Sequence, residues 1–234
     1  MENYKDDSEE VSTDDERGAM LRVDHHQIVG DNATQTPSPN VGGRFERPNP
    51  DTIIIHFTDG HTLEAAVDTL CDVQKEVSAH LVVGRDGALV QLLPFDQIAW
   101  HAGQSSWGDR TQFNQYALGI EVQNAGRLQL KNGRFVSSLG YEYPRYEVCQ
   151  AVHRNQVSPS YWHTYSTVQL AVVERACRTL VETYGIRHIL GHEEIAPQRK
   201  IDPGPAFPLD RLRHELLYRV APSLEPATAL GLPK

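Results

Sequence analysis

Residues 191–204, GHEEIAPQRKIDPG, constrain the chain most, because they place an imidazole, an ammonium and a carboxylate in one short loop. Pro197 and the pair Pro203–Gly204 prevent a continuous helix through this segment. The loop must therefore fold back on itself, which allows His192 and Asp202 to approach each other. Such groups are typical ligands of catalytic zinc, which takes three protein ligands and leaves a further position for water. The segment predicts a metal site whose third ligand comes from elsewhere in the chain.

A buried strand predicted at residues 52–57 supplies that ligand. The run TIIIHF is apolar and β-branched, as in central strands that are covered on both faces, and it contains His56 near its end. A second short strand, residues 188–191, leads directly into His192. A lone histidine at a strand end is more often a hydrogen-bonded core residue than a ligand. Because two strands end in this way and a loop carboxylate follows the second, we interpret His56, His192 and Asp202 as the metal ligands.

Further periodic segments surround these strands and indicate an α/β fold. The helix signal is clearest at residues 166–184, where Ser166 and Gln169 form a capping box and Gly185 ends the apolar stripe. The other expected elements are helices at 63–70 and 209–220 and strands at 79–83, 88–93 and 118–122. We therefore expect a single domain with a central mixed β-sheet flanked by helices.

Composition sets the expected domain boundaries. Residues 1–18 are acidic and poor in large apolar side chains, which predicts a disordered tail. Residues 19–51 are rich in Pro, Gly, Asn and Thr and are expected to form an extended arm. The compact domain is predicted at 52–220, followed by a tail at 221–234. Within the domain, the aromatic and irregular segment 126–165 is expected to be an inserted loop that forms a rim of the substrate site.

The net charge of −9 is unevenly distributed along the 234 residues. The first 17 residues hold eight acidic side chains against Lys5 and Arg17, so the remainder of the chain is nearly neutral. A basic surface is the electrostatic signature of nucleic-acid binding. The sequence therefore predicts no nucleic-acid partner.

Cysteine usage and terminal patterns bear on the compartment. Cys71, Cys149 and Cys177 are odd in number and widely spaced, so we expect buried free thiols rather than a disulfide framework. The sequence has neither a basic and apolar leader nor an apolar run of about 20 residues, the length that a membrane span requires. We expect synthesis in the cytoplasm, with action there or after export by a non-Sec route, for which a secretion or immunity protein is a candidate partner.

Four segments resemble the zinc-dependent N-acetylmuramoyl-L-alanine amidases of the AmpD-like type, which are relatives of phage lysozyme and the peptidoglycan recognition proteins. The segments are IIIHFT at 53–58, AWHAG at 99–103, LGIEVQN at 118–124 and GHEEIAPQRKIDPGPAFP at 191–208. The resemblance covers about residues 52–212 and implies one zinc ion held by His56, His192 and Asp202. The phage branch has a cysteine as its last ligand, so Asp202 indicates the AmpD-like branch.

The resemblance also implies that Glu121 and Lys200 are catalytic, and simple chemistry supports these roles. Glu121 would take a proton from the attacking water and pass it to the leaving amine. Lys200 would stabilise the oxyanion that develops on the carbonyl oxygen. Without the resemblance, Glu121 would be interpreted as an exposed strand-end carboxylate and Lys200 as a solvated loop lysine.

Aromatic residues and other histidines complete the expected site. Trp100 and His101 would either line the substrate groove or pack in the core, and Trp162 in the aromatic segment is expected to contact substrate. His80 is expected to be structural. The pair at 25–26 is expected to lie on the surface of the arm.

The implied activity is hydrolysis of the amide between N-acetylmuramic acid and L-alanine in peptidoglycan or its soluble muropeptides. The alternative is a peptidoglycan-binding module of the same fold without catalysis. A recycling enzyme, an endolysin and a secreted effector would all fit the implied activity. The insertion at 126–165 favours a polymeric substrate over a pure recycling role.

Overall fold

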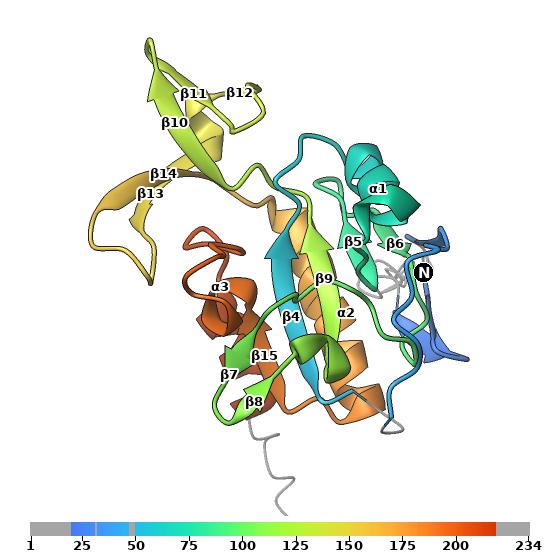
Figure 1. Ribbon diagram of the computed structural model, residues 1–234. Helices are drawn as coiled ribbons and strands as arrows, with labels where there is room; N and C mark the ends of the chain where they lie inside the picture. Colours follow the sequence, from blue (N-terminus) through green and yellow to red (C-terminus); the bar gives the residue numbers. More distant parts are fainter. Residues whose placement is uncertain (1–19, 31, 47–49, 219–234) are drawn as a thin grey trace, which may run out of the picture.

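A six-stranded mixed sheet forms the centre of the protein, of which the computed structural model describes residues 20–30, 32–46 and 50–218 (Figure 1). The sheet order is β15-β4-β9-β5-β6-β3. The strands are β3 (Ala33–Gln35), β4 (Thr52–Phe57), β5 (Leu81–Val83), β6 (Leu89–Gln91), β9 (Ala117–Val122) and β15 (His188–Gly191). All neighbours are parallel except the pair β5 and β6, which is the predicted hairpin. The expected mixed α/β architecture is confirmed.

The two faces of the sheet have different coverings. Ile53 and Ile55 of β4 point into the main core beneath α2 (Thr167–Tyr184), which lies behind β4 and β9 in Figure 1. Ile54 points to the opposite face, where it packs in a smaller apolar cluster with Phe113. Because side chains alternate along a strand, His56 shares the face of Ile54. The functional side chains described below leave the sheet on this second face.

Local signals position the helices. Ser166 and Gln169 form the predicted capping box of α2, and Gly185 ends this helix with a positive φ of 64°. The N-terminus of α1 (Leu63–Cys71) is capped by the Thr62 hydroxyl, which accepts a hydrogen bond from the Ala65 N–H group. The remaining helices are α3 (His192–Ile195) and α4 (Leu209–Arg213), which continues as a π-helix over His214–Tyr218. None of the helices in the described ranges has the length and apolar composition that a membrane crossing requires.

Residues 127–163 form a second sheet, and this corrects the expectation of an irregular loop at 126–165. We call it the inserted sheet; its order is β12-β11-β10-β14-β13, and every pairing is antiparallel. Its strands are β10 (Arg127–Lys131), β11 (Arg134–Val136), β12 (Glu142–Tyr143), β13 (Val148–Val152) and β14 (Pro159–His163). Asn132 and Gly133, both with positive φ, join β10 to β11 in the turn that an Asn-Gly pair favours. The inserted sheet projects away from the central sheet in Figure 1.

The N-terminal arm is more regular than expected and belongs partly to the domain. Strands β1 (Arg22–Asp24) and β2 (Gln27–Val29) form a hairpin, and β3 extends the central sheet beside β6. The domain therefore includes residues before Thr52. His26 at the hairpin turn lies beside Tyr184, with 2.9 Å between His26 Nδ1 and the phenolic oxygen, so this histidine is not simply a surface residue. The predicted tails at 1–18 and 221–234 lie outside the described residues.

The remaining elements and the thiols complete the fold. A small hairpin pairs β7 (Ser106–Trp107) with β8 (Arg110–Thr111). Short 3-10 turns occupy Val73–Lys75, Phe113–Gln115 and Arg145–Glu147. All three cysteines are free, but only Cys177 is fully buried; Cys71 and Cys149 are partly exposed.

Candidate metal centre

Three side chains predicted to bind a metal come together where β4 and β15 end. These two strands are parallel neighbours, with Gly191 paired to Ile55, so the next residue of each strand segment brings His192 beside His56. Asp202 returns to the same place in the loop that follows α3. We call residues 191–204 the metal loop. Pro197 and Pro203 predicted that this loop folds back on itself, and in the structure His192 and Asp202 near its two ends meet.

The ligand atoms converge on one point. The Nδ1 atoms of His56 and His192 lie 2.8 Å apart, and each lies 3.0 Å from Oδ2 of Asp202. All three side chains are buried, with residue exposures of 2%, 2% and 5%. Two imidazole nitrogens and one carboxylate oxygen are a donor set found in catalytic zinc sites. The residues therefore fit a divalent metal with three protein ligands.

Hydrogen bonds on the far side of each ring fix where the imidazole protons lie. His192 Nε2 is 3.1 Å from the carbonyl oxygen of Ala102, which only accepts, so Nε2 carries the proton. His101 Nε2 likewise donates to the Ala117 carbonyl oxygen at 3.1 Å, which leaves His101 Nδ1 to accept from His56 Nε2 at 3.0 Å. Neutral His56 and His192 therefore both present Nδ1 lone pairs toward Asp202. Lone pairs that face a carboxylate need a cation between them.

Burial and charge keep the site in the state that binds metal. Burial lowers the pKa of His56 to about 4, so this ring is neutral at pH 7. Burial alone would raise the pKa of Asp202, but its close polar contacts with His192 and His56 outweigh burial and hold this pKa well below 3.8. A neutral imidazole and an ionised carboxylate are the forms that coordinate a metal.

Glu121 lies beside the ligands on the neighbouring strand β9. It is partly buried and lines the same groove, and its Oε2 atom is buried with no hydrogen-bond partner among the described residues. Burial and the negative charge of Asp202 raise the pKa of Glu121 well above 4.5, and Lys200 opposes this shift. The alternative of an exposed strand-end carboxylate does not fit. A carboxyl group with a raised pKa and an unused oxygen is suited to accept a proton.

Lys200 is the one cationic side chain of the metal loop that is partly buried against the groove. It lines the groove with the three ligands, and its charge acts on both Glu121 and His56. Its neighbour Arg199 also lines the groove, but it is exposed and donates to the carbonyl oxygens of Ala102 and Gln104 at 2.8 Å. Lys200 is therefore the ammonium group of this loop that faces the groove.

His101 has a supporting role that the sequence did not reveal. It lines the groove, but its ring is held between His56 and the Ala117 carbonyl group, so it orients a ligand. A Cβ atom at Gly119 would lie 2.5 Å from His101 Cγ, so a glycine is required there for the ring to fit. His80, as expected, is structural: Gly119 N–H donates to its Nδ1 at 3.0 Å, and its Nε2 bonds the Gln97 carbonyl oxygen.

The two tryptophans differ in position. Trp100 is partly exposed and lines the groove. Trp162 is 1% exposed, is not among the groove-lining residues, and stacks on His153 with ring centroids 5.5 Å apart. The expectation that Trp162 contacts substrate is therefore corrected, because it packs behind the metal loop.

The groove has a volume of about 1170 Å³ and is formed by two parts of the chain. The metal ligands and the segment after β4 line one side, and the inserted sheet contributes Leu128, Leu130 and Tyr161. Tyr141 from the inserted sheet stacks on His61, with centroids 4.2 Å apart. The sequence analysis did not identify His61 as a groove residue. The one available signal was its position shortly after β4, the strand that contains His56.

Comparison with known proteins agrees with this geometry. Residues 46–205 match the Amidase_2 family, described as N-acetylmuramoyl-L-alanine amidase. The chain is 30% identical over 205 residues to the 1,6-anhydro-N-acetylmuramyl-L-alanine amidase AmpD of Escherichia coli, an alignment that covers 80% of this chain and 92% of that protein. A crystal structure of a selenomethionine AmpD derivative superposes with a TM-score of 0.60 at 26% identity, covering 83% of this chain and 98% of the other.

A second solved structure shows the same fold. The amidase AmiD of E. coli, in complex with the substrate anhydro-N-acetylmuramic acid-L-Ala-D-gamma-Glu-L-Lys, superposes with a TM-score of 0.54 at 24% identity. The match covers 85% of this chain and 66% of that one. The chain therefore belongs to the Amidase_2 family of N-acetylmuramoyl-L-alanine amidases.

Proposed function

We propose that this protein hydrolyses the amide bond between the lactyl carbonyl of N-acetylmuramic acid and L-alanine, with one Zn²⁺ ion as its cofactor. The family match and the AmpD relative support the reaction class. The observation that carries the proposal is the buried cluster of His56, His192 and Asp202, which opens onto a groove that Glu121 and Lys200 also line. A binding module without catalysis would not require this complete set.

His56 Nδ1, His192 Nδ1 and Asp202 Oδ2 would hold the ion. When bound, Zn²⁺ supplies Lewis-acid polarisation of the scissile carbonyl and lowers the pKa of water at the site. His101 and the Ala102 carbonyl oxygen hold the two imidazoles with their Nδ1 lone pairs toward the ion. The ligand geometry is therefore set before the ion arrives.

Glu121 would act as the proton carrier. Its carboxylate accepts the proton of the attacking water and then donates it to the nitrogen of L-alanine as the amide bond breaks. The pKa of Glu121, raised by burial and by Asp202, favours acceptance of this proton. Lys200 would donate a hydrogen bond to the carbonyl oxygen as negative charge develops there.

The groove supports peptidoglycan or its fragments as the substrate class. Its volume of about 1170 Å³ exceeds the range of roughly 300–1000 Å³ typical of small-molecule sites. The inserted sheet adds an apolar wall with Leu128, Leu130 and Tyr161. We propose that this wall accommodates polymeric glycan in addition to soluble muropeptides of the kind named for AmpD and AmiD.

Product analysis tests the proposal. The zinc-loaded protein is incubated separately with intact sacculi and with soluble 1,6-anhydro-muropeptides, and the new ends are identified by mass spectrometry. We expect free L-alanine amino termini and intact sugars from both substrates. Binding to sacculi without new amino termini would instead support the non-catalytic binding module. Release from soluble fragments alone would contradict the role assigned to the wall.

A further inference from the structure

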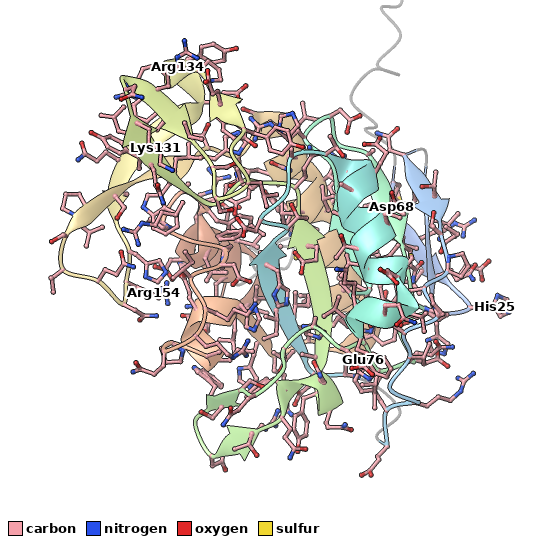
Figure 2. All side chains as sticks on the ribbon, turned by 45° about the horizontal axis from the view of Figure 1, so that its top comes forward. His25, Asp68, Glu76, Lys131, Arg134 and Arg154 are labelled. Atoms are coloured by element: carbon pink, nitrogen blue, oxygen red, sulfur yellow. The ribbon has the colours of Figure 1, made fainter. Side chains whose placement is uncertain are left out.

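The turn between β13 and β14 of the inserted sheet contacts the metal loop directly. His153 Nε2 donates to Glu193 Oε2 at 2.5 Å, and Arg154 forms an ion pair with Glu193, with 2.9 Å between Arg154 Nε and Glu193 Oε1. Asn155 Nδ2 donates to the Glu193 carbonyl oxygen at 3.0 Å. The side chains of His153 and Glu193 are 0% and 4% exposed. Figure 2 shows Arg154 at this end of the inserted sheet, with Lys131 and Arg134 at the opposite tip.

Glu193 also ties together the two segments that carry metal ligands. It follows His192 directly, and its backbone N–H donates to the carbonyl oxygen of Asp202 at 2.8 Å. Its Oε2 accepts the Gly204 N–H at 3.1 Å, two residues beyond Asp202. One residue therefore links both ends of the metal loop to each other and to the inserted sheet.

Contacts within the inserted sheet hold His153 in the orientation that makes this link. Asn155 N–H donates to His153 Nδ1 at 3.2 Å, so Nε2 carries the proton that Glu193 accepts. Trp162 stacks on the His153 ring at an interplanar angle of 20° and donates from Nε1 to the Ala151 carbonyl oxygen. A Cβ atom at Gly204 would lie 2.9 Å from Trp162, so the metal loop packs closely against this ring.

We propose that Glu193 is a positioning residue for the metal centre, and that the inserted sheet holds it in place through His153. Glu193 does not coordinate the metal. It acts through His192 and Asp202, whose separation its hydrogen bonds fix. Partners that orient metal ligands in this way typically contribute about 10- to 100-fold in metal affinity or activity. The inference rests on the metal site of the proposed function, and it gives the inserted sheet a role besides lining the groove.

Zinc binding by a Glu193→Gln variant tests the proposal. The amide nitrogen of glutamine would face His153 or Arg154, both of which are donors, so at least one bond of the network is lost. We expect the Zn²⁺ affinity, measured by competition with a chelating dye, to fall about 10- to 100-fold. The measurement is made at a temperature at which circular dichroism shows both proteins fully folded. The visible spectrum of the Co²⁺-loaded variant should also differ from that of the parent protein.

Two controls separate positioning from general stability. Glu147 and His163 form a similar pair within the inserted sheet, with 3.3 Å between His163 Nε2 and Glu147 Oε2, away from the metal loop. Glu147→Gln should therefore leave the Zn²⁺ affinity unchanged. His153→Gln keeps a donor toward Glu193 and should retain most of the affinity, whereas His153→Leu should lose it. If Glu193→Gln does not fold, the comparison of His153→Gln with His153→Leu tests the proposal instead.

The outcomes are distinct. Lower Zn²⁺ affinity in Glu193→Gln and His153→Leu, with normal affinity in the two conservative controls, supports the inference. Unchanged Zn²⁺ affinity in folded Glu193→Gln or His153→Leu, with only a lower melting temperature, would overturn it. If the parent protein itself bound no Zn²⁺, the proposed function would fail first and this inference with it.

Discussion

His56 and Glu121 occupy paired positions on the parallel strands β4 and β9, so their side chains leave the central sheet on the same face. A proposed metal ligand and a carboxylate with a raised pKa are therefore neighbours through strand register alone. His192 joins them because β15 pairs with β4 on the other side. The three side chains thus lie together at the carboxyl ends of three adjacent parallel strands, where ligand sites are common in α/β folds.

Replacing Glu121 by Gln should abolish turnover while leaving the metal bound. The amide cannot accept a proton from water, and loss of a general base costs about 10²- to 10⁴-fold. The check is kcat on a muramoyl-L-alanyl peptide, with zinc content measured on the same sample. Turnover within a few-fold of the parent protein would remove Glu121 from the mechanism.

The same Glu121→Gln variant should be more stable than the parent protein when both are metal-free. Burial raises the pKa of Glu121, so above its ordinary value of 4.5 the folded state binds this proton more tightly than the unfolded state does, and folding is penalised as the carboxyl group ionises. The penalty disappears as pH falls to the ordinary value of 4.5, because the unfolded state then also takes up the proton. We expect a melting temperature about 2–4 °C higher at pH 7, the shift that ~1 kcal/mol produces in a domain of this size. The difference should shrink toward pH 4.5, and a constant difference across this range would contradict the assigned pKa shift.

Lys200→Ala should lower kcat by about 10²- to 10³-fold, the usual loss for one oxyanion donor. Zinc content should not change, because Lys200 is not a ligand. Lys131, exposed at the tip of the inserted sheet, provides the matched control, and Lys131→Ala should have normal kinetics. Equal kcat values for the two variants would show that Lys200 takes no part in catalysis.

His101 should affect metal affinity rather than substrate affinity alone. His101→Phe removes the acceptor for His56 Nε2–H, which frees the His56 ring to rotate or to change tautomer. Zn²⁺ affinity measured by calorimetry should fall about 10- to 100-fold. His101→Asn, whose side-chain oxygen can replace Nδ1 as the acceptor, should recover part of the loss. An altered KM with normal Zn²⁺ affinity would instead make His101 a substrate-contacting residue.

The sequence predicted the parts of the site that depend on local pattern. The run TIIIHF indicated a strand buried on both faces, and the prolines of the metal loop indicated a fold-back; both appear in the structure. The register that places Glu121 beside His56 could not be read from either strand alone. The register depends on which strands lie side by side in the sheet, and the separation of two strands along the sequence does not determine this.

The inserted sheet shows where local reasoning failed. Asn132-Gly133 is a strong hairpin signal, but the irregular spacing of aromatic residues around it suggested a loop. Trp162 was expected to contact substrate because a tryptophan on the inner face of a strand looks the same in sequence as an exposed one. The bond between His153 and Glu193 joins residues 40 positions apart, and no local pattern predicts it.

Removal and return of zinc tests the central claim most directly. The protein is stripped with a chelator, assayed for release of L-alanine amino termini from an N-acetylmuramoyl-L-alanyl peptide, and assayed again after titration with Zn²⁺. We predict no release from the stripped protein and full recovery at one Zn²⁺ per chain, with no recovery in Asp202→Ala. Equal release from the stripped protein and the zinc-loaded protein would contradict the account.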